Sequence, residues 1–129
     1  MIRVVRLGSP RDRDEGVRIG TVRRPPRCVK KENFASLNYF DVWLPELAPP
    51  ADVVTWALSK PWTDARWSRY SRRYRAQMAK APASRIIATL AALSKQTNFS
   101  IGCYCEDESH CHRSLLRELL IEHGADVSA

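Results

Sequence analysis

The sequence predicts a single α/β domain over residues 1–129, with a mixed or mainly parallel sheet flanked by helices. The length of 129 residues suits one domain. Short apolar runs typical of strands occur near the start of the chain and again near residue 100. Segments with helical periodicity lie between these runs and after the last one. This order of strand, strand, helices, strand and helix favours a sheet covered by helices.

The first third of the chain predicts two strands and two shorter elements. Residues 2–7 alternate enough to form a strand that ends at a Gly-Ser-Pro turn. Residues 17–23 predict a second strand, which stops at a pair of prolines because proline cannot donate to a ladder. Residues 30–37 indicate a short helix, and residues 39–44 indicate either a strand or a packed turn.

The middle of the chain predicts three helices, over residues 52–59, 63–79 and 84–94. Ser84 is the expected N-cap of the third helix. The second helix carries an aromatic stripe among arginines, a mixture that can also bind nucleic acid. The spacing favours a buried stripe with the arginines on a solvated face. The stripe consists of Trp67, Tyr70, Tyr74 and Met78.

The last quarter predicts a strand followed by a helix. Residues 99–105 form the strand, in which every second side chain shares a face. Residues 111–123 form the helix, and Gly124 ends it. The strand face comprises Phe99, Ile101, Cys103 and Cys105, and the buried helix face comprises Leu115, Leu116, Leu119 and Leu120.

The net charge of +7 comes entirely from the first quarter of the chain. Residues 1–31 contain ten Lys or Arg and three acids, whereas the remainder carries eleven of each. Such a basic segment attracts phosphate, in a nucleotide or in nucleic acid. The alternative is that the charge only keeps the protein in solution.

Composition also limits the class of protein. The sequence has no apolar run of about 18 residues, so no membrane span is predicted. The N-terminus is too short and too charged to be a signal peptide, and the expected location is the cytoplasm. The four cysteines are therefore expected to be thiols, metal ligands or reactive groups rather than disulfides.

Residues 103–113, Cys-Tyr-Cys-Glu-Asp-Glu-Ser-His-Cys-His-Arg, form the candidate functional segment. The predicted strand ends within it, and the predicted helix begins at Cys111 and His112. Ligands of open α/β sheets bind outside the carboxyl ends of strands. Helix N-termini offer free N–H groups to anions. We therefore expect Cys105, Cys111 and His112 to converge there.

The main functional hypothesis is that this segment binds a phosphate-bearing ligand, either a nucleotide or a nucleic-acid end. Arg113 and Ser114 would contact the phosphate, because a guanidinium fork suits its oxygens. Arg23 and Arg27 would close the pocket across the sheet. A non-enzymatic alternative is a nucleic-acid-binding module that uses the basic residues of segments 3–31 and 66–75.

The same segment also fits thiol or metal chemistry. In an enzyme, Cys103, Cys105 or Cys111 would be the nucleophile and His112 the acid or base. In a zinc-binding structural or adaptor domain, the same four residues would be the ligands. The common Cys-x-x-Cys spacing of zinc sites is absent. A purely structural interpretation is that Cys103 and Cys105 are small core residues and that Asp107 or Ser109 caps the helix.

The segment resembles the bacterial and archaeal family known as domain of unknown function 488. The family motif is Cys-x-Glu followed by Cys-His-Arg; Cys103, Cys111, His112 and Arg113 fit it, whereas Cys105 stands at the glutamate position. The segments 18–31, where Arg23, Pro26 and Arg27 fit, and 67–78 are similar to a shorter branch of the family. The resemblance implies a compact α/β domain and brings no established activity.

Overall fold

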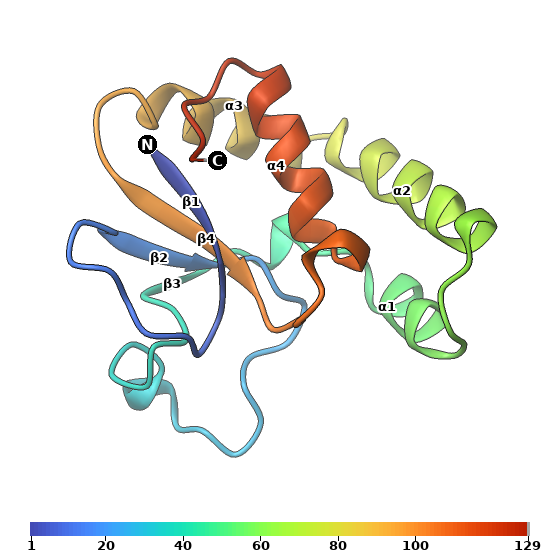
Figure 1. The fold of residues 1–129 in the computed structure, drawn as a ribbon, viewed down its shortest axis with the longest axis horizontal. Helices are drawn as coiled ribbons and strands as arrows, with labels where there is room; N and C mark the ends of the chain where they lie inside the picture. Colours follow the sequence, from blue (N-terminus) through green and yellow to red (C-terminus); the bar gives the residue numbers. More distant parts are fainter. Residues whose placement is uncertain (129) are drawn as a thin grey trace.

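A computed structural model describes residues 1–128, in which four parallel strands form one sheet. The strands are β1 (Ile2–Arg6), β2 (Val17–Gly20), β3 (Val42–Trp43) and β4 (Phe99–Cys103). Their order is β1-β4-β2-β3, so that the last strand of the chain lies between the first two (Figure 1). The predicted α/β fold with a mainly parallel sheet is confirmed.

Four α-helices accompany the sheet, and their order matches the predicted helices. They are α1 (Ala51–Leu58), α2 (Asp64–Met78), α3 (Ala83–Leu93) and α4 (His112–Glu122). The Thr63 side chain caps α2 by accepting a hydrogen bond from the Arg66 N–H at 3.1 Å. Gly124 follows α4 with a φ of +82°, the left-handed conformation that glycine adopts after a helix.

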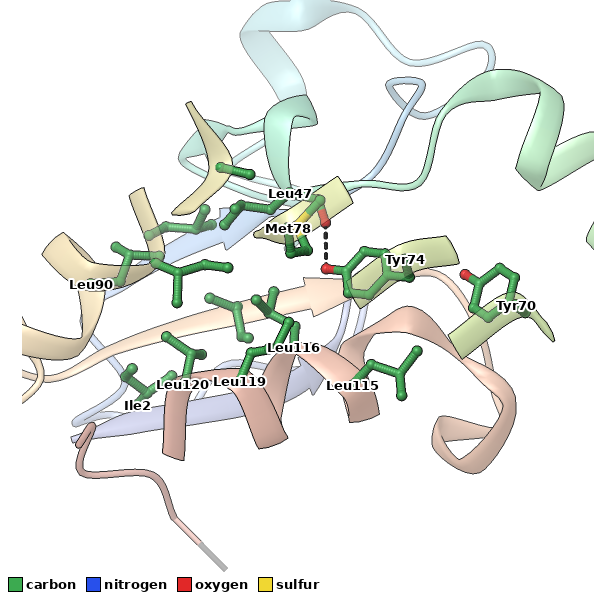
Figure 2. Packing of buried hydrophobic residues seen from close by; sticks show 14 of the residues in the cluster. Ile2, Leu47, Tyr70, Tyr74, Met78, Leu90, Leu115, Leu116, Leu119 and Leu120 are labelled. Atoms are coloured by element: carbon green, nitrogen blue, oxygen red, sulfur yellow. Dashed lines mark hydrogen bonds between the residues drawn. The ribbon is translucent and has the colours of Figure 1, made fainter. Parts of the chain in front are cut away.

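All four helices pack on one face of the sheet. Ile19, Phe99 and Ile101 point to this face and share one large buried cluster with side chains of every helix. Figure 2 shows its centre, where the Tyr74 hydroxyl donates to the Leu47 carbonyl at 2.7 Å. The predicted stripe of α2 is buried at Tyr70, Tyr74 and Met78, and partly buried at Trp67; the four leucines of α4 are buried as predicted.

Irregular segments cover the opposite face of the sheet. Arg18 points to this side and is fully buried, with its guanidinium paired to Glu15. The same guanidinium donates to the carbonyls of Ser9 and Asn38, both at 2.8 Å. Arg18 thereby holds two loops, around residues 9 and 38, against the sheet.

Several predicted boundaries are wrong. The strand over 17–23 ends at Gly20, and the strand over 99–105 ends at Cys103. The helix expected over 30–37 is only a 3-10 turn at Lys31–Asn33, and the choice left open for 39–44 resolves as the short strand β3. Ser84 is not an N-cap, because α3 begins at Ala83 and has no side-chain cap. Among the described residues, no helix is long and apolar enough to cross a membrane.

Candidate metal and thiol site

The candidate site lies between the carboxyl end of β4 and the first turn of α4. Cys103 is the last residue of β4, Cys111 is the N-cap residue of α4, and His112 is the first helical residue. The connecting loop contains a 3-10 turn at Glu108–His110, which the Asp107 carboxylate caps by accepting from the Ser109 N–H at 3.0 Å. The predicted strand–loop–helix geometry is therefore present.

Three buried side chains converge in this site. The sulfurs of Cys103 and Cys111 and a ring nitrogen of His112 all lie within 4.8 Å of one another. The residues are 6%, 1% and 5% exposed, respectively. Cys105 is exposed, but its sulfur lies only 3.7 Å from that of Cys103. Cys103, Cys111 and His112 could therefore hold a metal ion, and the fourth predicted residue, Cys105, lies beside Cys103 at the exposed side of this group.

The orientation of the His112 ring follows from its contact with Thr21, the residue after β2. Its Nε2 lies 2.6 Å from the Thr21 carbonyl oxygen, which can only accept, so Nε2 carries the proton. The other ring nitrogen, Nδ1, then carries a lone pair and lies 3.9 Å from the Cys111 sulfur. Burial lowers the pKa of His112 to about 4, so the ring is neutral at physiological pH.

The three thiols shift one another's acidity. Hydrogen bonds from Cys103 and Cys111 hold the pKa of Cys105 well below its usual range, and the positive charge of the nearby Arg113 acts in the same direction. The Cys105 sulfur, as a neighbouring anion, raises the pKa of Cys103, and the other two thiols raise that of Cys111. These shifts favour the thiolate form at Cys105, the exposed thiol, over Cys103 and Cys111.

The predicted anion-binding residues contact the backbone of the protein. The Arg113 guanidinium is buried and donates to the Cys105 carbonyl at 2.7 Å. Arg23 donates to the carbonyls of Ala48 and Pro49, and the Ser114 hydroxyl donates to that of Cys111. Arg27 is exposed on the loop after β2. The structure brings Arg113 and Ser114 to the cluster, and a phosphate contact by any of these residues stays a prediction.

Several contacts beside the cluster had no signal in the sequence. Thr21, whose backbone carbonyl accepts the hydrogen bond from His112 Nε2, follows β2 as an ordinary buried residue. His110 of the loop stacks on Trp62, with ring centroids 5.6 Å apart, and meets the edge of Trp67 at 5.3 Å. These contacts tie the loop to the start of α2. They depend on how α2 packs against α4, which local sequence patterns do not report.

The fold and the site together define a parallel α/β protein with a cysteine–histidine cluster at the carboxyl edge of its sheet. The chain matches the family described as the active DUF488-N3 subclade over residues 2–124 and belongs to that family. The resemblance to domain of unknown function 488 is therefore confirmed. No curated protein and no solved structure matches the chain significantly.

Proposed function

We propose that this protein binds one zinc ion through Cys103, Cys105, Cys111 and His112. The proposal rests mainly on the three buried ligand atoms of Cys103, Cys111 and His112, which lie within 4.8 Å of one another. Thiolate and imidazole are the ligand types that zinc takes in proteins. The exposed Cys105 would complete the set of four ligands.

One distance at the site matches a tetrahedral zinc ion. With Zn–S bonds of about 2.3 Å, two sulfurs of a tetrahedron lie about 3.8 Å apart. The sulfurs of Cys103 and Cys105 are 3.7 Å apart, close to that edge length. The fit supports a site in which these two sulfurs occupy adjacent corners.

The tautomer of His112 supports the same proposal. A histidine that binds a metal ion commonly donates its other ring N–H to a backbone carbonyl or a carboxylate. His112 donates through Nε2 to the Thr21 carbonyl, which leaves Nδ1 free on the side of Cys111. The ring is also neutral, as a metal ligand must be.

A bound zinc ion would act on all three thiols. Its positive charge favours the thiolate form of each coordinated cysteine, against the mutual repulsion present without metal. Because Cys105 is exposed whereas the other ligands are buried, solvent and ligands approach the site from the Cys105 side. Cys105 is therefore the group that would meet a substrate. The family description, an active subclade, is compatible with such a reactive position.

Metal content tests the proposal directly. Untagged protein purified in reductant should contain about one zinc per chain by elemental mass spectrometry. The double variant Cys111→Ser/His112→Ala should lose the zinc. Cys28→Ser is the matched control, because Cys28 is exposed and lies outside the cluster, so this variant should keep the metal.

A second candidate function rests on Cys105 alone. Its exposure and lowered pKa are the properties of a nucleophilic thiolate. Wild-type protein that is folded but carries no zinc would refute the metal proposal and leave this candidate. Iodoacetamide at about pH 6 should then modify Cys105 well before Cys28, because Cys105 is the exposed thiol whose pKa is lowered. Equal modification of both would refute the nucleophile as well.

A further inference from the structure

The positive charge of the first quarter is concentrated in one exposed loop. Arg3, Arg6, Arg11 and Arg18 each pair with a carboxylate. The loop over residues 24–31 instead holds four cations and no acid. Among residues 1–128, no carboxylate forms an ion pair with any of these four. We call this segment the cationic loop; its cations are Arg24, Arg27, Lys30 and Lys31.

An aromatic cleft of about 420 Å³ adjoins the cationic loop. This volume lies in the range of binding sites for small organic groups. Phe34, Phe40 and Trp43 are its aromatic walls, and Pro25 and Lys31 of the cationic loop also line it. Trp43 is 41% exposed, yet its Nε1 donates to the Val22 carbonyl at 2.7 Å. The cleft therefore presents a fixed and exposed indole, whereas Phe40 is almost entirely buried.

The cleft and the cationic loop are both connected to the cysteine cluster. Phe40 packs in the same small buried cluster as Cys103 and Cys111. The Tyr104 hydroxyl donates to the Arg24 carbonyl at 3.0 Å, and Tyr104 lies between two site cysteines in the sequence. A ligand that spans the loop and the cleft would thus lie beside the candidate metal and thiol site.

We propose that the cationic loop and the aromatic cleft bind single-stranded nucleic acid, with one base in the cleft and backbone phosphates on the loop. Aromatic walls beside a row of cations provide base stacking and phosphate attraction together. An acidic protein or an anionic membrane would engage the cations but would not need the cleft. A mononucleotide would fill the cleft but leave most of the spaced cations unused.

The carboxylates that line the cleft are compatible with a base. Asp41 is already neutralised by a two-point ion pair with Arg11, at 2.7 and 3.1 Å. Glu32 is exposed, and its oxygens can accept from the amino groups of a base. The phosphates would lie on the other rim, along the cationic loop. This proposal does not depend on zinc, so either can fail while the other stands.

Fluorescence anisotropy with labelled oligonucleotides of about 12 nucleotides tests the proposal. The variant Lys30→Glu/Lys31→Glu should bind at least tenfold more weakly at about 50 mM salt. It should also lower the slope of log affinity against log salt by about 1.4, which is 0.7 for each lost phosphate contact. The matched control is Arg13→Glu/Lys95→Glu, which reverses two exposed cations outside the cationic loop and should keep near wild-type affinity and slope.

The variant Trp43→Leu tests base stacking in the cleft separately from the cations of the loop. Loss of one stacking surface should reduce affinity roughly ten- to a hundredfold without changing the salt slope. Separate DNA and RNA arms show which strand the site accepts, and binding of either supports the proposal. Three results would overturn it: equal loss in the control, unchanged affinity in Trp43→Leu, or equally tight binding of phosphatidylserine vesicles. Melting curves for each variant confirm that it is folded.

Discussion

The two faces of the sheet are filled in different ways. On the helical face, Ile2, Ile19 and Ile101 pack against apolar side chains of all four helices. On the loop face, Arg18 of β2 and Ser100 of β4 are buried and polar. Two residues further along each strand, the same face carries glycines, at residues 20 and 102. The same two central strands therefore alternate between an apolar core and a hydrogen-bonded layer.

The two faces differ in what they contribute: the helical face mainly stabilises the fold, and the loop face mainly positions segments around the site. Apolar burial on the helical face is non-directional and stabilises the fold in proportion to area. The loop face is directional, because Arg18 must meet Glu15 and two loop carbonyls at once. The small cluster with Phe40, Cys103 and Cys111 lies at the carboxyl edge, where the two faces meet. The candidate site thus depends on both layers.

The largest expected effect is on the helical face. Leu116→Ala removes a side chain that is 0% exposed at the centre of the large cluster. We expect the free energy of unfolding to fall by about 4 kcal/mol, from lost transfer and the cavity left behind. Urea denaturation measures this change. Leu58→Ala is the control, since Leu58 is 82% exposed and should cost less than about 0.5 kcal/mol. Similar losses in the two variants would contradict the assignment of the main core.

A somewhat smaller loss is expected on the loop face from Glu15→Gln. Glu15 is 2% exposed and accepts three hydrogen bonds, two from the Arg18 guanidinium and one from Ser100. Removing its charge leaves a buried guanidinium without its counter-ion, which should cost about 3 kcal/mol. Glu32→Gln, at an exposed glutamate, is the matched control and should be nearly neutral.

The pH dependence of stability tests whether the ion pair between Glu15 and Arg18 causes the loss expected in Glu15→Gln. Burial opposes ionisation of Glu15, but the hydrogen bonds from Arg18 and Ser100 prevail and lower its pKa below the ordinary 4.5. The carboxylate therefore contributes its full stability above about pH 4.5 and loses it as the pH falls through the lowered folded pKa. The gap between wild type and Glu15→Gln should narrow at about pH 3. A gap that stays constant would mean that packing, not charge, causes the loss.

The helical face could be predicted from the sequence because its signals are local. The periodicity of Tyr70, Tyr74 and Met78 identified the buried side of α2, and that of four leucines identified α4. The approach of Cys111 and His112 to the end of β4 also followed from local geometry, a strand end followed by a helix start. The third residue within 4.8 Å of both is Cys103, however, where the sequence predicted Cys105.

The loop face could not be predicted, because its partners are far apart in the sequence or lack periodicity. Arg18 belongs to an expected strand, but nothing local indicates that its guanidinium binds the carbonyl of Asn38, twenty residues later. The contact of His112 with Thr21 spans 91 residues. Residues 21–41 have mostly irregular backbone, with positive φ values at Cys28 and Asn38, where helical and strand periodicities do not apply.

The smallest predicted loss of stability is that of Gly20→Ala, which lies on the loop face against a residue of the aromatic cleft. A Cβ atom at Gly20 would lie 2.3 Å from Cδ2 of Phe40, a ring that is only 4% exposed. Gly20→Ala must therefore displace Phe40, and we expect it to cost about 2 kcal/mol in the free energy of unfolding. Because Phe40 is a wall of the cleft, affinity for a single-stranded oligonucleotide should fall as well.

Gly102→Ala is the comparison that separates these two effects. Its Cβ would lie 2.7 Å from Leu7 Cδ2 and 2.8 Å from the Val5 carbonyl oxygen, on the same face of the sheet but against residues that do not line the cleft. This variant should lose a similar amount of stability in urea denaturation while keeping its oligonucleotide affinity, measured well below its melting temperature. If both glycine variants lose affinity in proportion to stability, the cleft is not an independent site. If only Gly20→Ala loses affinity, the loop face determines the shape of the binding surface and not only the stability of the sheet.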